Sequence, residues 1–309
     1  MKKKIFIDGR VGTTGLRIEE RLLGRDDLEL LTLPEELRKD TEARREIINS
    51  SDVVFLCLPD AAAIEAVSLI ENDAVTVIDA STAHRTNPAW AYGFPELGAD
   101  FEEKIRNSTR IANPGCHASG FIALVYPLIK NGILSKDALL TAHSITGYSG
   151  GGKKMIAEYE AEEIDPLLTA PRQYGISQNH KHLPEMTAIT GLKNAPVFSP
   201  IVSSFYSGME VTVPLFREQI SGSVNDIKEI YRAAYASPII SYHDADDEAG
   251  FLSAAKYADK DSMGISVFGN DERIILVARY DNLGKGASGA AVECLNVKLG
   301  CDKAKTLVI

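Results

Sequence analysis

Short apolar runs alternate with segments of helical periodicity between residues 4 and 79 of this 309-residue chain. Residues 53–58 are all apolar, which is typical of a strand buried on both faces of its sheet. Alternating strands and helices predict βαβ units, right-handed crossovers and a doubly wound parallel sheet. We expect strands at 4–8, 28–33, 52–59 and 75–79, and helices at 15–23, 43–49 and 61–70.

The first expected strand runs directly into a glycine-rich loop that opens a helix. Glycines let the main chain approach a pyrophosphate, and a helix N-terminus offers N–H groups and the positive end of its dipole. A glycine-rich loop alone is a weak signal, but here it stands in the strand–loop–helix context that dinucleotide binding requires. The residues assigned to the cofactor phosphates are Gly9, Arg10, Val11, Gly12, Thr13, Thr14 and Gly15.

The end of the second expected strand, at residues 32–34, carries no acidic side chain. A site that prefers NAD usually places Asp or Glu there for the ribose 2′-hydroxyl. Arg38 and Lys39 lie nearby in sequence, and so does Arg10 of the loop. Because a guanidinium pairs with a 2′-phosphate that a carboxylate would repel, the pattern favours NADP(H). The open alternative is that one of the glutamates at positions 35 and 36 supplies the acid.

The pattern changes after residue 116, where a helix is expected at 118–129 and strands at 139–146, 198–214 and 273–279. The stretch at 198–214 is long and mixes apolar residues with Ser and Thr, which fits a mixed or antiparallel sheet. Helices would cover one face of that sheet, and a second subunit could cover the other. A helix rich in Gly and Ala is expected at 284–298.

The formal net charge of -10 and the isoelectric point near 5.2 leave no basic field for a polyanion. Nucleic acid and anionic membranes are therefore excluded as expected partners. The apolar stretch after the N-terminal lysines is too short for a signal peptide, and no apolar run approaches the roughly 18 residues of a spanning helix. We expect a soluble, cytoplasmic protein.

Four cysteines are scattered along the chain without CxxC spacing, which argues against a zinc site and against a disulfide framework. Cys57 lies in an apolar run and Cys294 on a helical stretch, so both are expected in the core. Cys301 is uninformative. Only Cys116 lies in a segment typical of a loop, beside Pro, Gly and His.

The segment 113–116, Asn-Pro-Gly-Cys, predicts a strand end, a sharp turn and a helix that begins at Cys116. A helix N-terminus lowers the pKa of a thiol because the dipole and unpaired N–H groups stabilise the thiolate. The same groups could donate to a tetrahedral oxyanion. Cys116 is therefore the candidate nucleophile. The alternative is a small buried residue at a domain junction.

A second polar cluster places His180, Lys181, His182 and Glu185 within six residues. An imidazole can transfer protons near neutral pH, and a carboxylate can fix its tautomer and orientation. A nucleophilic Cys, a His base and a dinucleotide loop together indicate covalent catalysis followed by hydride transfer. Zinc binding by the two histidines is the competing interpretation, but no third histidine or paired cysteine has suitable spacing, so no metal is expected.

Several further motifs accompany these clusters in one order along the chain. They occupy residues 79–85, 93–97, 113–116, 147–153, 180–185 and 281–287. With them and the glycine loop, the chain closely resembles the shorter form of the N-acetyl-gamma-glutamyl-phosphate reductase family, which is grouped with aspartate-semialdehyde dehydrogenase. It is more distantly similar to phosphorylating glyceraldehyde-3-phosphate dehydrogenase. The resemblance covers nearly the whole chain.

The resemblance implies that NADPH reduces N-acetylglutamyl 5-phosphate to the 5-semialdehyde and phosphate, a step of arginine biosynthesis. Cys116 would attack the acyl carbon and form a thioester, and hydride transfer would then produce a thiohemiacetal that releases the aldehyde. His182 is our choice for the acid/base, with Glu185 orienting it. His180 is the close alternative, Glu185 could instead cap a turn, and Lys181 could point into solvent.

A substrate with a phosphate and a carboxylate needs cationic and polar ligands. Arg85 and Lys153 are candidate anion ligands. The alternative for Arg85 is a surface salt bridge, and the alternative for Lys153 is that the loop before it is merely flexible. By resemblance, Asn282 reaches the nicotinamide. The expected substrate ligands are Arg85, Asn113, Ser149, Gly150 and Lys153, and the further cofactor contacts are Pro59, Ser81 and Asn282.

The resemblance also implies an α/β fold with a Rossmann-type NADP-binding domain at 1–115. Residues 116–283 would form an α+β catalytic and oligomerisation domain of the semialdehyde dehydrogenase type, and a helix at 284–309 would return to the first domain. We expect a homodimer or homotetramer. The enzymatic rival is aspartate-semialdehyde dehydrogenase or a related acyl-phosphate reductase. A non-enzymatic rival is an NADP-sensing binding protein, against which the joint presence of Cys116 and the 180–185 cluster argues.

Overall fold

The computed structural model describes residues 2–309, which form two compact units. The first unit contains the chain up to Pro95 together with Ala99–Pro114 and Ala287–Leu307. The second contains Glu96–Gly98, Gly115–Gly286 and Val308–Ile309. The longest segment of the second unit therefore begins one residue before Cys116 and ends at Gly286.

The first unit is built on a parallel sheet of six strands, in the order β2-β1-β3-β4-β6-β5. The predicted doubly wound parallel sheet is confirmed. The strands are β1 (Lys3–Asp8), β2 (Leu28–Leu31), β3 (Val53–Leu56), β4 (Thr76–Asp79), β5 (Ala91–Tyr92) and β6 (Arg110–Ala112).

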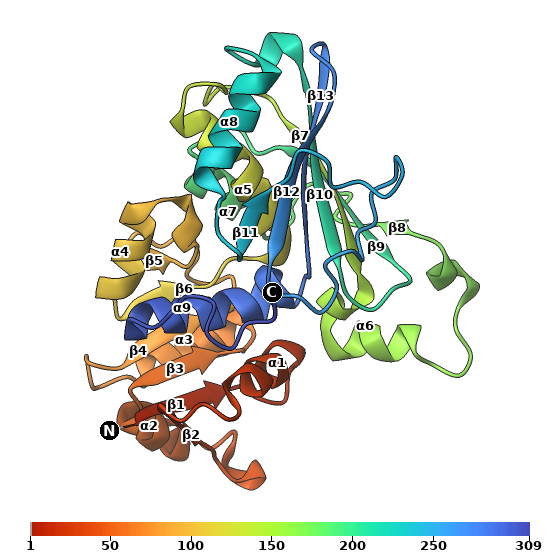
Figure 1. Cartoon of the computed structure of the whole chain (residues 1–309). Coiled ribbons are helices and arrows are strands. Elements are labelled where there is room, and N and C mark those ends of the chain that lie inside the picture. The colour runs from red at the N-terminus through yellow and green to blue at the C-terminus, as the bar shows by residue number, and fades with distance from the viewer. Residues whose placement is uncertain (1) are drawn as a thin grey trace. The chain divides into compact units, whose positions relative to one another are not determined.

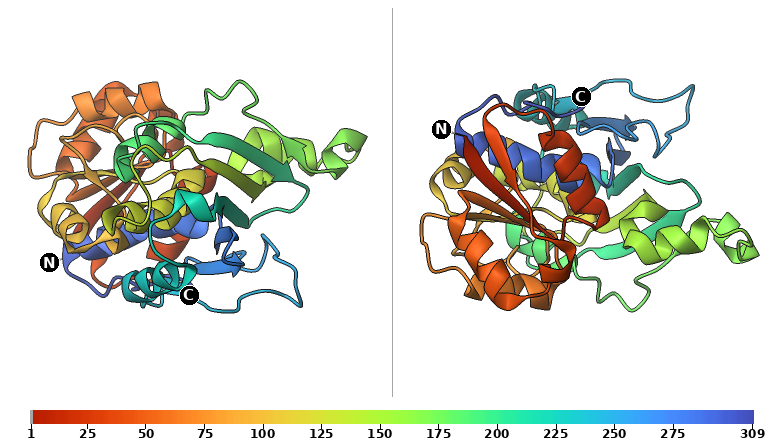
Figure 2. Two further views of the ribbon diagram at one scale, coloured as in Figure 1. Left: turned by 90° about the horizontal axis from the view of Figure 1, so that it is seen from above. Right: turned by 90° about the horizontal axis from the view of Figure 1, so that it is seen from below.

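Helices cover both faces of this sheet, as Figures 1 and 2 show. Successive strand residues point to opposite faces, so Ile5 and Ile7 join one apolar core and Phe6 joins the other. Cys294 is fully buried in the first core, and Cys57 packs against its edge. The helices α1 (Thr13–Leu22), α4 (Ala99–Asn107) and α9 (Gly289–Leu299) lie on the first face, and α2 (Thr41–Ser50) and α3 (Asp60–Ser68) on the second.

The second unit is built on a mixed sheet of seven strands, in the order β11-β12-β13-β10-β7-β9-β8. β7 pairs parallel with β9, and β11 pairs parallel with β12, while the other pairs are antiparallel. The strands are β7 (Thr141–Gly147), β8 (Arg172–Gln173), β9 (Val197–Ser203), β10 (Met209–Phe216), β11 (Ile240–Tyr242), β12 (Met263–Gly269) and β13 (Arg273–Tyr280).

The predicted strand at 198–214 is wrong as a single element, because the chain turns between β9 and β10. The two strands lie on either side of β7 and not side by side. Gly208 in the turn has φ +125°, and a Cβ there would lie 2.5 Å from the Ala254 carbonyl oxygen. The polar and apolar residues give little sign of the turn, because their mixture continues from β9 into β10.

Helices pack against the seven-stranded sheet of the second unit, as the yellow-green and cyan ribbons of Figure 1 show. The helix α5 (Cys116–Lys130) contacts β10 and β13, and α7 (Leu183–Thr190) and α8 (Val224–Ala234) pack against α5. α6 (Gly152–Tyr159) follows a short 3-10 turn, Tyr148–Gly151, and packs near β9 through Tyr159 and Val202. The helix predicted at 284–298 begins instead with a π-helical turn, Gly284–Ser288, before α9.

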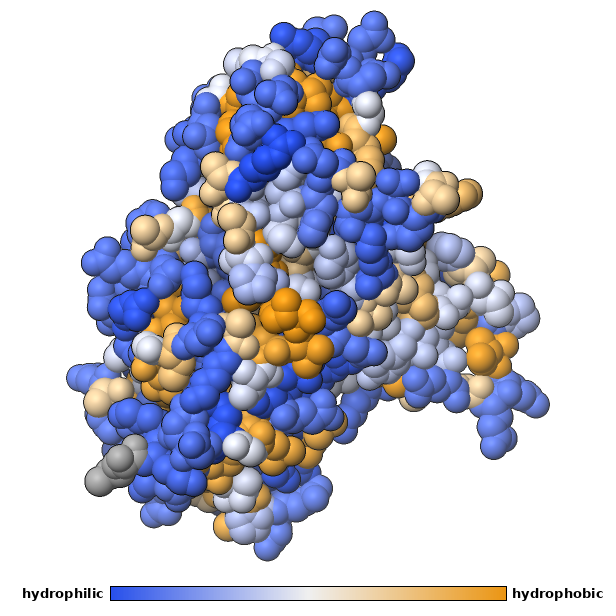
Figure 3. All heavy atoms as spheres, viewed as in Figure 1, coloured by the Kyte–Doolittle hydropathy of each residue, from blue (hydrophilic) through white to orange (hydrophobic). Residues whose placement is uncertain are grey.

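No helix among residues 2–309 is long and apolar enough to cross a membrane. Hydrophilic residues cover most of the face that Figure 3 shows, and the apolar residues on it form small separate groups.

Candidate active site

The glycine loop of the first unit has the shape that a dinucleotide requires. Gly9 has φ +84°, and a Cβ there would lie 2.3 Å from the Cys57 carbonyl oxygen. A Cβ on Gly15 would lie 2.6 Å from the Gly9 carbonyl oxygen. α1 begins at Thr13 with Gly12 as its N-cap, and no side chain caps it. The N–H groups of the first turn therefore suit a pyrophosphate, which a helix N-terminus binds well.

The other predicted cofactor contacts of this unit lie at the carboxyl ends of its strands, where doubly wound sheets bind their ligands. Pro59 follows β3 and is the N-cap of α3. Ser81 follows β4, and its hydroxyl donates to Asp79 Oδ2 at 2.7 Å. That bond fixes the loop after β4, and it engages the serine hydroxyl with a neighbouring protein side chain.

The cations near the expected 2′-phosphate position are engaged in surface ion pairs. Arg10 Nη1 lies 2.8 Å from Glu19 Oε1, and Arg38 pairs with Glu35. Exposed pairs of this kind contribute little stability, so a ligand phosphate can replace the carboxylate at small cost. Val11 is exposed at the tip of the loop, and Thr13 and Thr14 begin α1.

Substitution of Gly15 by alanine should weaken NADPH binding by at least about tenfold, because the new methyl group would displace the Gly9 carbonyl and deform the phosphate loop. A dissociation constant measured by NADPH fluorescence tests this. Gly24→Ala is the control, since no atom lies within 4 Å of a Cβ at Gly24. Equal affinity of Gly15→Ala and the wild type would contradict the assignment of the loop.

Arg85 and Asn113, two predicted substrate ligands, meet in the first unit. Arg85 Nε donates to the Asn113 carbonyl oxygen at 2.9 Å, and Arg85 Nη2 donates to the Ala80 carbonyl oxygen at 3.0 Å. Arg85 is buried, so the alternative of a surface salt bridge is wrong. Asn113 Nδ2 donates to the Ala287 carbonyl oxygen, and its buried Oδ1 has no hydrogen-bond partner among the described residues. A buried acceptor without a partner is the kind of atom that a ligand satisfies.

Cys116 is the first residue of α5, and its N-cap, Gly115, provides no side-chain cap. The thiol is partly exposed. Tyr280 Oη donates to the Cys116 carbonyl oxygen at 2.6 Å and accepts from Gly120 N at 3.0 Å. A Cβ on Gly286 would lie 3.1 Å from Cys116 Cβ, so the main chain at Gly286 forms a wall beside the nucleophile. The predicted helix start at the cysteine is confirmed.

Glu185 contacts the turn that precedes the nucleophile. Its Oε1 accepts a hydrogen bond from the Gly115 N–H at 2.8 Å, and the residue is almost completely buried. This bond matches the alternative in which Glu185 caps a turn. It ties the first turn of α7 to the start of α5.

Three histidines pack together, and one of them, His117, directly follows the candidate nucleophile Cys116. The ring of His117 lies 5.6 Å from those of His180 and His182, and the latter two are 4.8 Å apart, centroid to centroid. His117 Nδ1 lies 2.7 Å from Ser144 Oγ, and Nε2 lies 2.6 Å from Tyr174 Oη. Sequence reasoning overlooked His117 and Tyr174, although His117 directly follows the motif at 113–116.

Burial disfavours the charged form of two rings in this cluster. Desolvation, and secondarily the charge of His180, lowers the pKa of His117 to about 3. Burial, and then the charge of Lys181, lowers the pKa of His180. Burial and the negative charge of Cys116 raise the pKa of Tyr174 well above its ordinary value. The neutral forms of His117 and His180 are therefore favoured, and a neutral imidazole is the form that acts as a general base.

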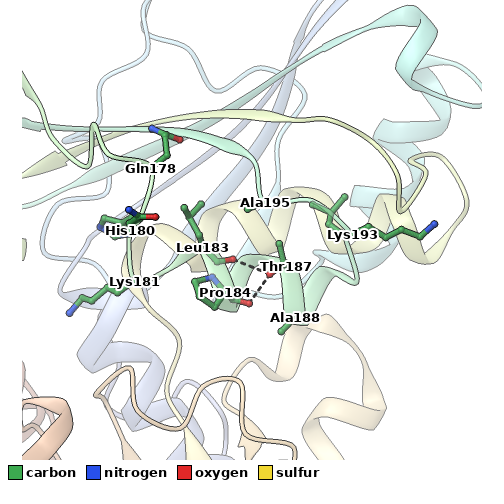
Figure 4. Close-up of a pocket in the computed structure, with 11 residues that line it drawn as sticks. Gln178, His180, Lys181, Leu183, Pro184, Thr187, Ala188, Lys193 and Ala195 are labelled. Carbon is green, nitrogen blue, oxygen red and sulfur yellow. Dashed lines mark hydrogen bonds between the residues drawn. The ribbon is translucent and has the colours of Figure 1, made fainter.

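A cavity of about 650 Å³ runs along α7 and reaches His180 (Figure 4). Leu183, Pro184 and Leu192 provide apolar lining. Lys181 is exposed at the His180 end, and Lys193 at the other end pairs with Asp137 at 2.7 Å. The cavity offers a ligand a path to the histidine cluster from within the second unit.

Three further predicted residues meet elsewhere in the second unit. Asn282 Nδ2 donates to Ser149 Oγ at 3.0 Å, and Asn282 Oδ1 accepts from Gly208 N at 2.9 Å. A Cβ on Gly150 would lie 3.4 Å from Asn282 Nδ2. Lys153 lies exposed in the first turn of α6. Within residues 2–309, no group of three or more His, Cys, Asp or Glu side chains is arranged so that it could hold a metal ion.

Two family models match the chain. The semialdehyde dehydrogenase NAD binding domain matches residues 14–107, and the semialdehyde dehydrogenase dimerisation domain matches residues 116–282. The chain belongs to the semialdehyde dehydrogenase family. The model of the dimerisation domain begins at Cys116, so the candidate nucleophile and the histidine cluster lie in that part of this family member.

Relatives within the semialdehyde dehydrogenase family confirm the resemblance that the motifs indicated. An N-acetyl-gamma-glutamyl-phosphate reductase of Sinorhizobium medicae is 45% identical, with 97% of this chain and 99% of the relative covered. The reductase named N-acetyl-gamma-glutamyl-phosphate reductase 2 of Pseudomonas putida is 44% identical, with 96% of each covered.

Solved structures of the family share the fold. Aspartate semialdehyde dehydrogenase II of Vibrio cholerae, in complex with ASA, superposes with a TM-score of 0.73 at 16% identity, covering 97% of this chain and 99% of that one. Aspartate semialdehyde dehydrogenase of Candida albicans, solved with NADP, gives a TM-score of 0.68 at 16% identity, covering 96% and 98%. At such low identity these structures support the fold alone.

Proposed function

We propose that this protein reduces N-acetylglutamyl 5-phosphate with NADPH to N-acetylglutamate 5-semialdehyde and phosphate, a step of arginine biosynthesis. The observation that carries the proposal is the position of Cys116 at the start of α5, where the next residue, His117, packs with His180 and His182. Relatives that are 43–45% identical over nearly their full length bear the name of this reductase. We place the reaction in the cytoplasm, where thiols stay reduced, and expect a homodimer or homotetramer.

The first chemical step forms a thioester. His182 takes the proton of the Cys116 thiol, and the thiolate attacks the acyl carbon of the substrate. The bond from that carbon to the phosphate oxygen breaks, and phosphate leaves. N–H groups at the start of α5 stabilise both the thiolate and the oxyanion of the tetrahedral intermediate. Glu185 keeps Gly115 in place for this step.

The second step releases the aldehyde. NADPH, when bound at the glycine loop, supplies the hydride that reduces the thioester carbonyl. The thiohemiacetal at Cys116 then collapses by breaking its carbon–sulfur bond, and the proton held by His182 returns to the thiolate. His180 is the alternative carrier of this proton. The lack of an acidic residue at the end of β2 supports NADPH over NADH.

The proposed substrate ligands can be described for each unit by itself. Asn113 Oδ1 supplies a buried acceptor, while Ser149, Gly150 and Lys153 supply donors and a positive charge. Arg85 acts chiefly by holding the Asn113 carbonyl, since two of its donors bind main-chain oxygens. Asn282 positions Ser149 and is the proposed contact for the nicotinamide.

Mass spectrometry of the protein trapped with acyl phosphate in the absence of NADPH tests this function. The N-acetylglutamyl group should appear on the peptide that contains Cys116, and aspartyl phosphate should acylate it far more slowly. An adduct on another residue, or none with either acyl phosphate, would refute the covalent mechanism. Faster acylation by aspartyl phosphate would assign the protein to the aspartate-semialdehyde reaction instead.

A further inference from the structure

His117 is a buried histidine beside the nucleophile for which the proposed chemistry provides no step. Only 2% of its surface is exposed. Its two ring nitrogens lie 2.7 Å from Ser144 Oγ on β7 and 2.6 Å from the Tyr174 hydroxyl just after β8. The ring is thus fixed from two strands at once.

Both partners of His117 suit an uncharged ring. A neutral imidazole has one N–H donor and one acceptor nitrogen, and a hydroxyl can serve either of them. Phe198 on β9 packs edge-on against the same ring. The titratable groups in ring contact with it are Tyr174, His180 and His182, and Cys116 precedes it on α5. None of these ring contacts is a carboxylate that would stabilise an imidazolium.

The position of His117 affects both candidate bases. Its ring lies edge-on to His180 at an interplanar angle of 87° and tilted at 53° to His182. The main-chain N–H of His182 also donates to His180 Nδ1 at 3.2 Å, which fixes the His180 ring against the backbone at His182. A positive charge on one of three packed imidazoles disfavours a charge on the others. An uncharged, immobile His117 therefore leaves the thiol proton to the His180–His182 pair.

We propose that His117 is a positioning residue, a permanently neutral ring fixed by Ser144 and Tyr174 that holds the His180–His182 pair in place for proton transfer from Cys116. The proposal rests on the assignment of Cys116 as nucleophile and of this pair as its base. It assigns to Tyr174 and Ser144 a role in catalysis that acts entirely through His117.

Nitrogen-15 NMR of histidine-labelled wild-type protein tests the neutral state, and the loss of one signal in His117→Asn identifies the residue among six histidines. The His117 nitrogens should keep the shifts of one neutral tautomer between about pH 5 and pH 8, the range in which an ordinary histidine titrates. Titration of His117 within that range would overturn the proposal.

Two variants that leave the ring in place test the positioning role. Tyr174→Phe and Ser144→Ala should each lower kcat by about tenfold, less than the roughly hundredfold loss on removing a general acid–base group itself, with KM for the semialdehyde and NADP+ nearly unchanged. Because both hydroxyls act through one ring, the double variant should be little worse than the more damaged single variant. Tyr231→Phe is the matched control. Its hydroxyl is also buried, and it donates to the Leu124 carbonyl oxygen on α5 and not to a histidine.

Alkylation of Cys116 by iodoacetamide separates this inference from the identity of the substrate. The reaction needs only the thiolate, so its pH profile reports proton transfer from Cys116 without any acyl phosphate. In Tyr174→Phe the midpoint should move to higher pH, because a loosened base stabilises the thiolate less, whereas Tyr231→Phe should keep the wild-type midpoint. An unchanged midpoint in Tyr174→Phe, or equal shifts in both variants, would refute the role of His117 even if the thioester forms as proposed.

Discussion

Cys116→Ser should lose at least about a thousandfold in kcat for phosphate-dependent oxidation of N-acetylglutamate semialdehyde by NADP+, as expected when a covalent nucleophile is removed. A serine hydroxyl at the start of α5 stays protonated near neutral pH, whereas a thiol there yields the thiolate that attacks and later leaves. NADP(H) affinity should stay close to that of the wild type, because the substitution leaves the glycine loop, the proposed phosphate contact, unaltered.

Cys301→Ser is the matched control, because that thiol contacts Arg25 and Asp27 in the first unit and has no part in the proposed chemistry. It should retain wild-type kcat. Full activity of Cys116→Ser would show that the reaction proceeds without a covalent intermediate at this residue.

His182→Asn should lower kcat by about a hundredfold or more, the usual contribution of a general acid–base group. The base must be neutral to accept the thiol proton, so the wild-type rate should fall as the pH drops through the pKa of that base. The same variant should lose this acidic limb, and single-turnover thioester formation over a pH series measures both effects.

The corresponding change at His180 decides between the two candidates. Burial and Lys181 lower the pKa of His180, so a limb that belongs to His180 would lie below the ordinary histidine range. Loss of the limb in His180→Asn, with its retention in His182→Asn, would move the proton-transfer role to His180. His243→Asn serves as control, since that ring bonds Ser241 on β11.

The fold of the first unit could be predicted well because its signals are local. A run such as Val53–Leu56 is buried on both faces, and only a parallel sheet between helices provides that environment. The second unit was harder to predict. Residues 197–216 mix polar and apolar side chains throughout, so the turn at Gly208 depends on its contact with Ala254, which is distant in sequence.

The candidate site was predictable where adjacent residues create the chemistry, as at Gly115 and Cys116. Roles that depend on distant partners were not. The hydrogen bond of Glu185 to Gly115 spans 70 residues of sequence, and that of His117 to Tyr174 spans 57. The hydrogen bonds of Arg85 to the Asn113 and Ala80 carbonyl oxygens likewise could not be read from the sequence, and its role as an anion ligand stays a prediction.

Gly286 shows how a position can matter for what it lacks. It contributes no acid, base or ligand, yet any side chain at this position would press against Cys116 Cβ and restrict the position of the Cys116 side chain. In a saturation-mutagenesis experiment selected for growth without arginine, this position should therefore tolerate as few replacements as the nucleophile itself. A covalent inhibitor aimed at Cys116 would meet backbone on that side, which restricts the directions from which an electrophile can reach the sulfur.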